Sequence, residues 1–502
     1  MRAEPLVLAI DQGTSATKTA LVNRAGDVVA RGVAGLPVHH PHRGWVEQSP
    51  AEIWHSLQAS VHACVEGTDP HQIVGMGLST QRESLLLWDR RTGQTRSPLV
   101  SWQDRRTTTM CREYAPSAAS VRRSSGLPLD PMFSATKARW LLDHADPDRV
   151  QASRGDLCLG TVDAWLVHRL TGQHQIEVGN ASRTQLMDIE TCQWSSELTD
   201  LFGVPAQALP DIVSSVGPFG QRRRDEALLP AGVPVLAGVP VLAVMGDSHA
   251  ALFGHAGWRN GLVKATYGTG SSVMAASSRR AGQASGLCET IAWQIGAEPV
   301  RALEGNIRAS GATLAWLAQL TSTSPAQLAS IAADAKAGGV HLVPGFNGLG
   351  APWWDPDTTG LLTGLTLGTT LENVARAALE STAFQINDLL IAIRGIAGEV
   401  GVLSVDGGAA ANSSLMQLQA DLSGTSVLRP KATDLSALGA AQLAGLAAGL
   451  WSLDDLDALP RLRDEFTPAT SADWRDAELA LWRAAIRRTR YHPEREDPKE
   501  EP

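Results

Sequence analysis

The sequence predicts an α/β protein that is built from two similar halves. Short apolar segments typical of strands alternate with helical segments along the chain, as in layered α/β folds. A Gly13-Thr14-Ser15 turn follows an apolar strand near the start, and a similar Gly268-Thr269-Gly270-Ser271 turn follows another strand in the second half. Backbone N–H groups in such turns can surround phosphate oxygens. Each half is therefore expected to open with a hairpin that can bind phosphate.

The first half is expected to begin as a β-meander and to continue with alternating helices and strands. Ser49 and Glu52 flank Pro50 in the pattern of a capping box, which predicts a helix from Pro50 to about Glu66. A second apolar helical face covers 134–144. Strands are predicted over 5–10, 18–23, 28–34, 73–79 and 84–89.

The second half begins near residue 250, which divides the chain into domains over 1–250 and 251–490. A strand, turn and strand are predicted over 261–277, and a strand, glycine-rich turn and helix over 402–412. The capping-box pattern from Thr369 to Glu372 opens a helix that runs to about Arg394. The charged, proline-containing tail over 491–502 is expected to be disordered.

Composition excludes several classes of function. The 502 residues carry 43 Lys and Arg against 52 Asp and Glu, a net charge of -9, which argues against a nucleic-acid-binding surface. The five cysteines show no C-x-x-C spacing, which excludes a zinc ribbon and a disulfide framework and suits a reducing, cytoplasmic compartment. The N-terminal segment lacks the apolar region and cleavage site of a signal peptide.

An uncharged segment over 227–246 is long enough to be tested as a membrane span. It contains three prolines and three glycines, which favour short buried strands over a helix, so no span is expected. The hexapeptide GVPVLA occurs twice in tandem within it, at 232–237 and 238–243. The duplication either extends a strand or forms a loop before it. Because six is an even number, an extended strand would keep the same face toward the core.

The first hairpin carries side chains that suit phosphate chemistry. Asp11 ends the strand, where a carboxylate can hold a magnesium-bound water, and Lys18 adds a positive charge after the turn over 13–15. The alternative is an ordinary glycine-threonine hairpin.

Two further glycine turns, at 268–270 and at Asp406-Gly407-Gly408, make a nucleotide cleft the better interpretation, because glycines let a backbone approach a ligand closely. Three unrelated turns are the alternative. A Walker A loop is absent from the sequence.

Asp247 ends a long apolar segment and enters a helix of small residues. A carboxylate there can accept the proton of a hydroxyl during phosphoryl transfer, although it can also act as a helix N-cap. Arg82 and Glu83 follow a strand as a donor and an acceptor that together suit a vicinal diol. A solvated surface pair is the alternative for these two residues.

An ordered set of motifs over residues 5 to about 490 resembles the FGGY carbohydrate kinases, and glycerol kinases most closely in pattern. The motifs are DQGT, QRE, SWQDRR, FSATK, GTVDAWL, NASRT, GDSHAALFG, TYGTG, GLGAPWWDP, GLTLGTTLENVARAALES and VDGGAAANSSLMQLQAD. The resemblance implies two actin-like (RNase H-like) domains with ATP and Mg²⁺ in the cleft between them, and a homodimer or homotetramer.

The resemblance also implies roles for individual residues. Asp247 would be the catalytic base, and Asp11 and Asp247 would hold Mg²⁺, either directly or through water. Lys18 stands where glycerol kinases usually have Arg, and Ala315 where the family has a nucleotide-contacting Gln. Nucleotide contacts are expected from Gly13, Thr14, Ser15, Lys18, Gly268, Thr269, Gly270, Gly311, Gly407, Gly408 and Asn412. Substrate contacts are expected from Arg82, Glu83, Trp102, Met132, Asp247, Ser248 and Ser272.

Three departures from the glycerol kinase pattern bear on the substrate. Met132 stands in place of Tyr, Ser248 in place of Gln and Ser272 in place of Phe. Because these changes remove a hydroxyl and shrink two side chains, they predict a wider pocket and a polyol or ketose of four or five carbons as acceptor. Glycerol itself is the alternative within the family.

A different class of function is an actin-like ATP-binding switch, or a catalytically weakened regulatory protein. The GVPVLA duplication lies directly before Asp247 and could displace it, which is what makes the weakened form worth testing. The Arg82–Glu83 pair speaks against a switch, because a switch needs no diol site.

Overall fold

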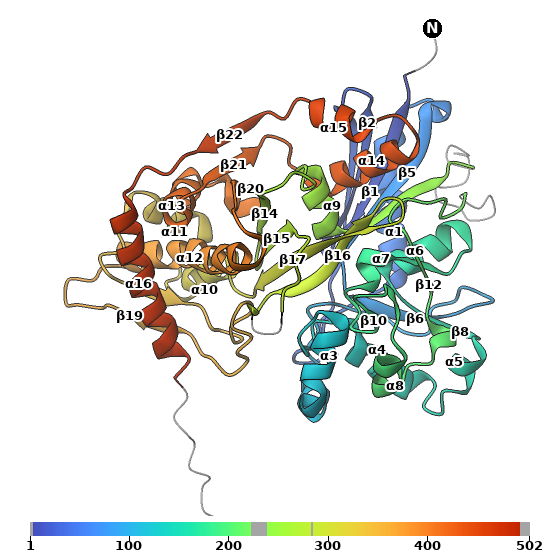
Figure 1. Ribbon diagram of the computed structural model, residues 1–502, viewed down its shortest axis with the longest axis horizontal. Helices are drawn as coiled ribbons and strands as arrows, with labels where there is room; N and C mark the ends of the chain where they lie inside the picture. Colours follow the sequence, from blue (N-terminus) through green and yellow to red (C-terminus); the bar gives the residue numbers. More distant parts are fainter. Residues whose placement is uncertain (1–3, 222–237, 283–284, 492–502) are drawn as a thin grey trace, which may run out of the picture.

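Two mixed β-sheets, one in each half of the chain, form the frame of the molecule and are covered by helices (Figure 1). The computed structural model describes residues 4–221, 238–282 and 285–491. This arrangement is the α/β, two-domain architecture that the sequence predicts.

The first sheet has the strand order β13-β5-β1-β2-β3. Strands β1, β5 and β13 are parallel, whereas β2 and β3 continue from β1 as antiparallel neighbours. Both faces of β1 are buried, which explains its unbroken apolar sequence. The strands are β1 (Leu6–Gln12), β2 (Ala16–Asn23), β3 (Val28–Gly35), β5 (Ile73–Thr80) and β13 (Val241–Gly246).

A smaller sheet with the order β4-β7-β6-β8 and several helices form the rest of the first half. Its strands are β4 (Glu47–Gln48), β7 (Leu99–Val100), β6 (Leu85–Asp89) and β8 (Leu157–Thr161). The helices are α1 (Pro50–Val65), α2 (Thr108–Glu113), α3 (Ala118–Ser125), α4 (Ser134–Ala145), α5 (Val150–Arg154), α6 (Val162–Thr171), α7 (Val178–Ala181), α8 (Ser196–Phe202) and α9 (Asp247–Gly254). Short paired strands are β9 (Gln175–Glu177), β12 (Asp211–Val213), β10 (Met187–Asp188) and β11 (Gln193–Trp194).

The second sheet has the strand order β16-β17-β15-β14-β20-β21-β22. Its strands are β14 (Leu262–Tyr267), β15 (Ser271–Ala276), β16 (Cys288–Gln294), β17 (Pro299–Ile307), β20 (Val402–Asp406), β21 (Ser426–Pro430) and β22 (Arg463–Phe466). The remaining elements are β18 (His341–Val343), β19 (Leu361–Thr363), α10 (Gly311–Leu320), α11 (Pro325–Asp334), α12 (Leu371–Ala397), α13 (Ser413–Ser423), α14 (Leu435–Ala447), α15 (Leu453–Ala458) and α16 (Ala472–Thr489).

The two faces of the second sheet pack against different elements, and this positions the site. One face carries Val263, Ala265 and Tyr267 into the core beneath α10, α12 and α13. The alternate residues of β14 point to the opposite face, toward α9. There the imidazole of His255, at the end of α9, bonds to Ser404 and Asp406 of β20 at 2.7 Å each. Polar contacts of the second sheet thus reach the helix that begins at Asp247, beside the apolar residues that also pack on it.

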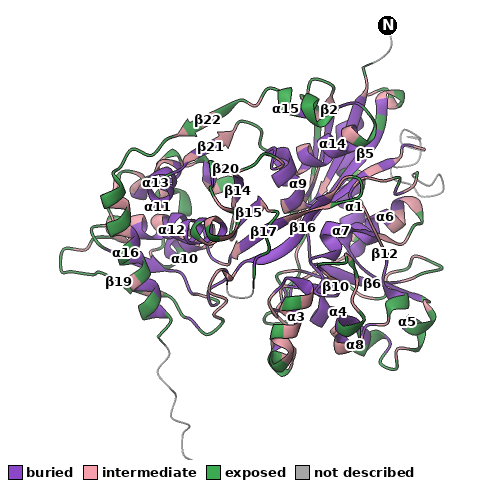
Figure 2. Ribbon diagram, viewed as in Figure 1, coloured by how far each residue is buried: buried purple, intermediate pink, exposed green. Residues whose placement is uncertain are grey.

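Helix α14 comes late in the chain but packs on the first sheet, against β1, β5, β13 and α9. Gly77 of β5 lets it approach, because a Cβ there would lie 2.2 Å from the carbonyl oxygen of Ala440. Figure 2 shows α9 and the strands beside it as buried, with exposed residues on the outer side of α16. The two halves therefore share one apolar region around α9 and α14.

The predicted elements agree with the structure, apart from two helix starts. The side chain of Ser49 makes no capping hydrogen bond on α1, so that capping box is wrong although the helix is present. On α12 the box is formed by Thr370 and Asn373, one residue later than predicted. The first GVPVLA copy and residues 492–502 of the predicted tail lie outside the described residues. The second copy forms a turn at Gly238 and the start of β13.

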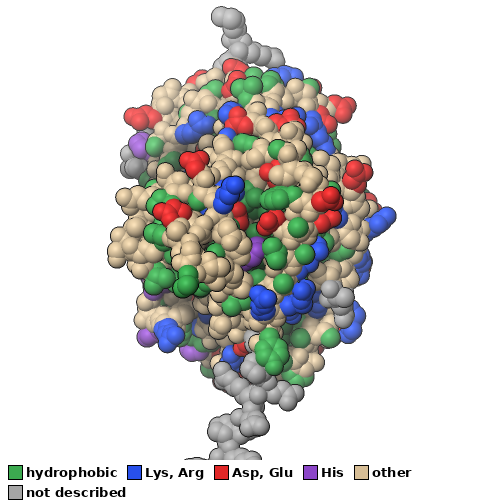
Figure 3. All heavy atoms as spheres, turned by 90° about the vertical axis from the view of Figure 1, so that its left-hand side faces the viewer, with side chains coloured by type: hydrophobic (Ala, Val, Ile, Leu, Met, Phe, Trp, Pro, Cys, Tyr) green, Lys and Arg blue, Asp and Glu red, His purple; other side chains and the backbone are tan. Residues whose placement is uncertain are grey.

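Among the residues that the structure describes, no helix is long and apolar enough to cross a membrane. Figure 3 shows the end of the second half, where acidic side chains lie mainly in the upper part of the view and basic side chains lie in both parts.

Candidate active site

The carboxyl ends of three parallel strands of the first sheet meet at one place and carry the candidate site. Asp11 lies near the end of β1, Arg82 and Glu83 follow β5, and Asp247 follows β13. The register aligns Asp11 with Ser79, whose hydroxyl donates to Asp11 Oδ1 at 2.7 Å. Ligands bind outside the carboxyl ends of parallel strands in open α/β sheets.

Asp11 and Asp247 lie close enough to influence each other's ionisation. Burial raises the pKa of Asp11 to about 6, and the charge of Asp247 contributes to this rise. Burial also raises the pKa of Asp247, whereas the nearby Arg82 guanidinium lowers it. A carboxylate with a raised pKa is a better proton acceptor, which suits a general base.

Arg82 lies between the two halves of the molecule. Its two Nη atoms contact the carboxylate oxygens of Glu304 on β17 at 2.6 and 3.0 Å. Its Nε lies 3.4 Å from Asp247 Oδ1. Although burial opposes ionisation of Glu304, the guanidinium groups of Arg183 and Arg82 hold the pKa of Glu304 well below its usual range. Arg82 is thus a fixed, buried cation beside the candidate base.

Glu83 is held by contacts within the first half. Its backbone is in the left-handed region with φ of 61°. Arg183 Nε lies 2.6 Å from Glu83 Oε1, and the hydroxyl of Ser134 donates to the Glu83 carbonyl at 2.9 Å. Arg183 also contacts Glu304, at 2.7 Å, so both predicted diol-binding residues belong to one buried ion network.

The other predicted substrate residues surround this network. The indole Nε1 of Trp102 donates to Thr14 Oγ1 at 3.0 Å, which ties it to the first hairpin. Met132 packs near Phe133 and Cys288. Ser272 donates to Glu304 Oε1 at 3.2 Å, and Ser248 is in the first turn of α9 beside Asp247. The structure therefore brings the predicted acceptor residues to one region.

The glycine turns of the second half also come together. The carbonyls of Gly268 and Thr269 accept from N–H groups at the start of α10, among them that of Gly311 at 3.0 Å. Gly407 packs so tightly on β14 that a Cβ would lie 2.4 Å from the Tyr267 carbonyl oxygen. Gly270 and Gly408 belong to these same two turns. The turn over 268–270, the start of α10 and the Gly407–Gly408 turn thus lie next to one another at the ends of β14 and β20.

Two predicted nucleotide residues already have other partners. Asn412 caps α13, where its side-chain oxygen accepts from the Leu415 N–H at 3.0 Å. The ammonium of Lys18 contacts Asp434, just before α14, at 3.1 Å, and is half exposed. Lys18 lies opposite Asp11 across the β1–β2 pair, so its contact to phosphate would require it to leave Asp434.

The donor set fits a magnesium ion. Mg²⁺ is commonly bound by one or two carboxylates together with phosphate oxygens and water. Asp11 and Asp247 are two such carboxylates, and the charge of Asp247 contributes to the raised pKa of Asp11, which a bound cation would offset. Among the described residues, no group of three or more His, Cys, Asp or Glu forms a complete metal site.

Sequence reasoning missed several residues that the structure places at the site. Lys264 on β14 is fully buried, and among the described residues its Nζ has no hydrogen-bond partner. Burial lowers the pKa of Lys264, whereas the charges of Asp406, Glu304 and Asp247 act to raise it. His249 is buried beside Arg82, which together with burial holds its pKa well below the usual range. Lys264 and Glu304 each interrupt an apolar strand sequence with a charge, and that signal could have identified them.

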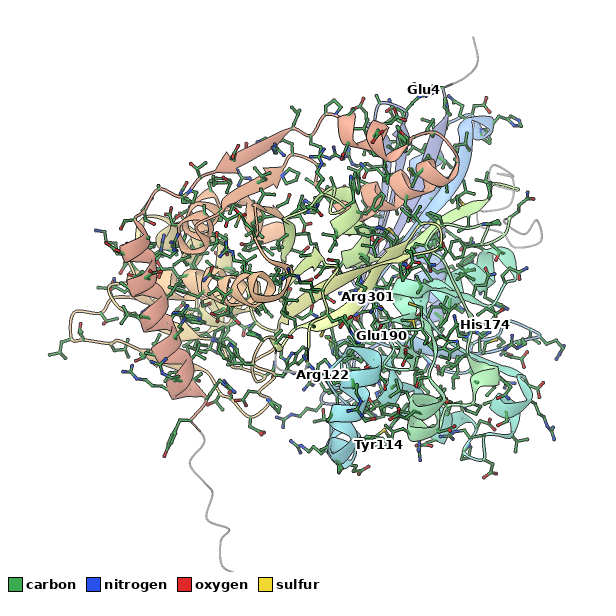
Figure 4. All side chains as sticks on the ribbon, viewed as in Figure 1. Glu4, Tyr114, Arg122, His174, Glu190 and Arg301 are labelled. Carbon is green, nitrogen blue, oxygen red and sulfur yellow. The ribbon has the colours of Figure 1, made fainter. Side chains whose placement is uncertain are left out.

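The halves are joined by further polar contacts beside the site. Arg301 of β17 contacts Glu190 of the first half at 3.1 Å, and Arg122 of α3 donates to the carbonyl of Leu287 at 2.9 Å. Figure 4 labels Arg122, Glu190 and Arg301, which lie at the junction of the two halves. The site is thus assembled from both halves, which explains why no single segment of sequence contains it.

Family models match most of the chain. The model for the N-terminal domain of the FGGY family of carbohydrate kinases matches residues 6–254, and the model for its C-terminal domain matches residues 263–448.

Full-length relatives and solved structures agree. A protein of Dechloromonas aromatica named glycerol kinase is 42% identical over 501 residues, which cover 97% of this chain and 98% of that protein. A glycerol kinase of Polaromonas naphthalenivorans is 42% identical and covers 96% and 99%. The structure of Plasmodium falciparum glycerol kinase with ADP has a TM-score of 0.88 at 29% identity, covering 98% of this chain and 99% of that one. A xylulose kinase of Lactobacillus acidophilus shares the fold, with a TM-score of 0.86 at 20% identity over 96% and 97% of the chains.

Proposed function

Because this chain belongs to the FGGY family of carbohydrate kinases, phosphotransferases with an alcohol acceptor, we propose that it phosphorylates a terminal hydroxyl of a small polyol from ATP. The comparisons favour glycerol as the acceptor. The two relatives at 42% identity are named glycerol kinase, and this chain matches them over nearly their whole length.

The observation that carries the proposal is the position of Asp247. It begins α9 at the end of β13, with a raised pKa, and lies 3.4 Å from a buried arginine. Asp247 would orient the acceptor hydroxyl and take its proton as the oxygen attacks the γ-phosphorus in line. Arg82 and Glu83 would hold the neighbouring hydroxyls as donor and acceptor.

The glycine turns would bind the nucleotide. Backbone N–H groups over 13–15 and 268–270 would stabilise the charge that develops on the transferred phosphoryl group. Gly311 and Gly407 let these turns pack closely on β14 and its turn, and Gly408 has open space beside it, where a nucleotide would come close to the backbone. Asp11 and Asp247 would hold Mg²⁺, which supplies positive charge to the phosphates when bound.

A polyol or ketose of four or five carbons is the second candidate acceptor. Met132, Ser248 and Ser272 all lie around the Arg82–Glu304 network, where each departs from the glycerol kinase pattern. Loss of the aromatic side chain at 272 makes room for a longer carbon chain beside β15. This observation keeps the second candidate beside glycerol.

A coupled assay on the purified protein separates the candidates. It measures ADP release with ATP·Mg²⁺ and glycerol, erythritol, threitol, erythrulose, the pentitols and the pentuloses. The highest kcat/KM with glycerol supports the first acceptor, and a four- or five-carbon compound at least tenfold better supports the second. ADP release that depends on none of these acceptors contradicts the kinase proposal and favours an ATP-binding switch.

Assembly as a homodimer or homotetramer is part of the proposal, and light scattering after size-exclusion chromatography measures it.

A further inference from the structure

A row of polar side chains along β17 joins the two halves at the candidate acceptor site. Glu304 contacts Arg82 and Arg183 of the first half. Arg308, just after the end of β17, lies 2.6 Å from Asp130 through its Nη2. Asn306 lies between Glu304 and Arg308, so the strand is held to the first half on both sides of it.

Asn306 points to the same face of the sheet as Glu304, because alternate residues of a strand share a face. It lies directly opposite Ser272 in the β15–β17 register. Ser272 uses its hydroxyl on Glu304 at 3.2 Å rather than on Asn306. Asn306 is thus a direct neighbour of the residue that replaces the aromatic side chain of glycerol kinases.

The amide of Asn306 is unsatisfied. Its Nδ2 is buried and has no hydrogen-bond partner within residues 4–221, 238–282 and 285–491. Buried side-chain amides are normally hydrogen-bonded, and an unpaired one is costly to keep. A donor without a protein partner beside the candidate acceptor residues is suited to a ligand oxygen.

We propose that Asn306 is a further acceptor-binding residue, whose Nδ2 donates to an oxygen that the acceptor carries beyond the three carbons of glycerol. The inference rests on the proposed kinase function and deepens it. It selects polyols and ketoses of four or more carbons that bear a hydroxyl or carbonyl oxygen at that position. Asp130 also accepts from the N–H of Met132 at 2.9 Å, so the Arg308–Asp130 pair joins the Met132 turn to the end of β17.

Matched substrates separate a hydrogen bond from mere pocket size. Erythritol carries a hydroxyl on its fourth carbon, whereas butane-1,2,3-triol has the fourth carbon without that hydroxyl. For the native protein, we expect kcat/KM to be at least tenfold higher with erythritol or its stereoisomer threitol than with butane-1,2,3-triol. Equal kcat/KM values for the two kinds of compound would overturn the proposal.

The Asn306→Leu variant keeps the approximate shape of the side chain and removes its hydrogen-bonding groups. We expect the ratio of kcat/KM for tetritol over butane-1,2,3-triol to fall at least tenfold. We expect its Tm not to fall, because the native Nδ2 has no protein partner to lose among the described residues. If Leu prevents folding, Asn306→Ser tests the same ratio with a hydroxyl that is too short to reach.

Asn387 of α12 is the matched control, because its side-chain amide is also buried and has no partner among the described residues. Asn387→Leu is expected to leave the ratio unchanged within about twofold. An unchanged ratio in both Asn306 variants, or an equal fall in the Asn387 variant, would overturn the role of Asn306 while leaving the kinase function intact. A native protein that phosphorylates no polyol would overturn the proposed function, and this inference with it.

Discussion

Arg82 of the first half and Glu304 of the second form a buried two-point ion pair, with N–O distances of 2.6 and 3.0 Å. Arg82 is 6% exposed and Glu304 is fully buried. Because the same guanidinium lies beside Asp247, the pair couples the packing of the two halves to the position of the candidate base. A contact that holds the domains together is therefore also part of the acceptor site.

Replacing Glu304 by Gln should weaken both the fold and acceptor binding. The change removes the carboxylate that Arg82 and Arg183 share, and both arginines are buried. Breaking a buried ion pair typically costs about 3–5 kcal/mol. We expect a lower free energy of unfolding in urea and a higher acceptor KM. Asp464→Asn is the control, since it breaks only partly exposed pairs, with Arg429 and Lys431, and should lower the free energy of unfolding far less. Equal losses in the two variants would contradict the importance assigned to burial.

Replacing Asp247 by Asn should abolish phosphoryl transfer and spare nucleotide binding. The amide keeps the shape of the side chain but cannot accept the hydroxyl proton, so kcat should fall by about 10²–10⁴. Single-turnover kinetics measures the chemical step, and titration calorimetry measures the ATP affinity. A parallel loss of both would show that Asp247 mainly supports the structure of the site.

Lys264→Met tests whether the buried ammonium serves catalysis. Met is similar in length and apolar, and the native Nζ makes no hydrogen bond within the part of the chain that the structure describes. We expect kcat to fall at least tenfold, because a cation near Asp247 and Asp406 is lost from the cleft. Circular dichroism melting should show little loss of stability. A large fall in Tm with normal kcat would assign Lys264 a structural role instead.

The acid side of the pH–rate profile should reflect the carboxyl groups of the site. Burial raises the pKa of Asp11 to about 6 and also raises that of Asp247, so both groups take up protons at higher pH than ordinary Asp. Protonated carboxyls can neither accept a proton nor hold a cation, so kcat/KM should increase from pH 5 to about pH 7. A profile that is flat down to about pH 4 would contradict the shared burial of this pair.

Deleting residues 238–243 tests the tandem repeat. The second GVPVLA copy supplies the start of β13, and the first copy has the same sequence, so the deletion places identical residues before Val244. We expect kcat/KM to stay within about twofold, because an identical strand register is available. A loss of more than tenfold with retained folding would show that both copies are needed to position Asp247.

The sequence predicted which site residues lie at the ends of strands better than it predicted which side chains they contact. Asp11 was predicted at the end of an apolar strand and Arg82 and Asp247 after two others, and the parallel pairing of those strands brings the three residues to one edge of the sheet. The helix that begins at Pro50 could also be predicted, because its start depends on residues that are neighbours in the sequence.

The side chains that these residues contact could not be predicted from the sequence. Glu304 is more than two hundred residues from Arg82 along the chain, and only the docking of the two sheets brings them together. Lys18 was expected to face phosphate, yet its nearest partner is Asp434, because α14 folds back over the first sheet. Such contacts depend on the tertiary arrangement rather than on any local pattern.

The position of α14 late in the chain also has a consequence during translation, because this helix covers a sheet that is synthesised much earlier. The apolar face of β1, β5 and β13 is complete when residue 246 has been made, but the helix that covers it, Leu435–Ala447, is synthesised roughly 190 residues later. At about 5–20 residues per second, the nascent chain would expose this face for roughly 10–40 s. The first half is thus a poor candidate for independent expression, and its folding on the ribosome would need either a chaperone or the arrival of its own distant helix.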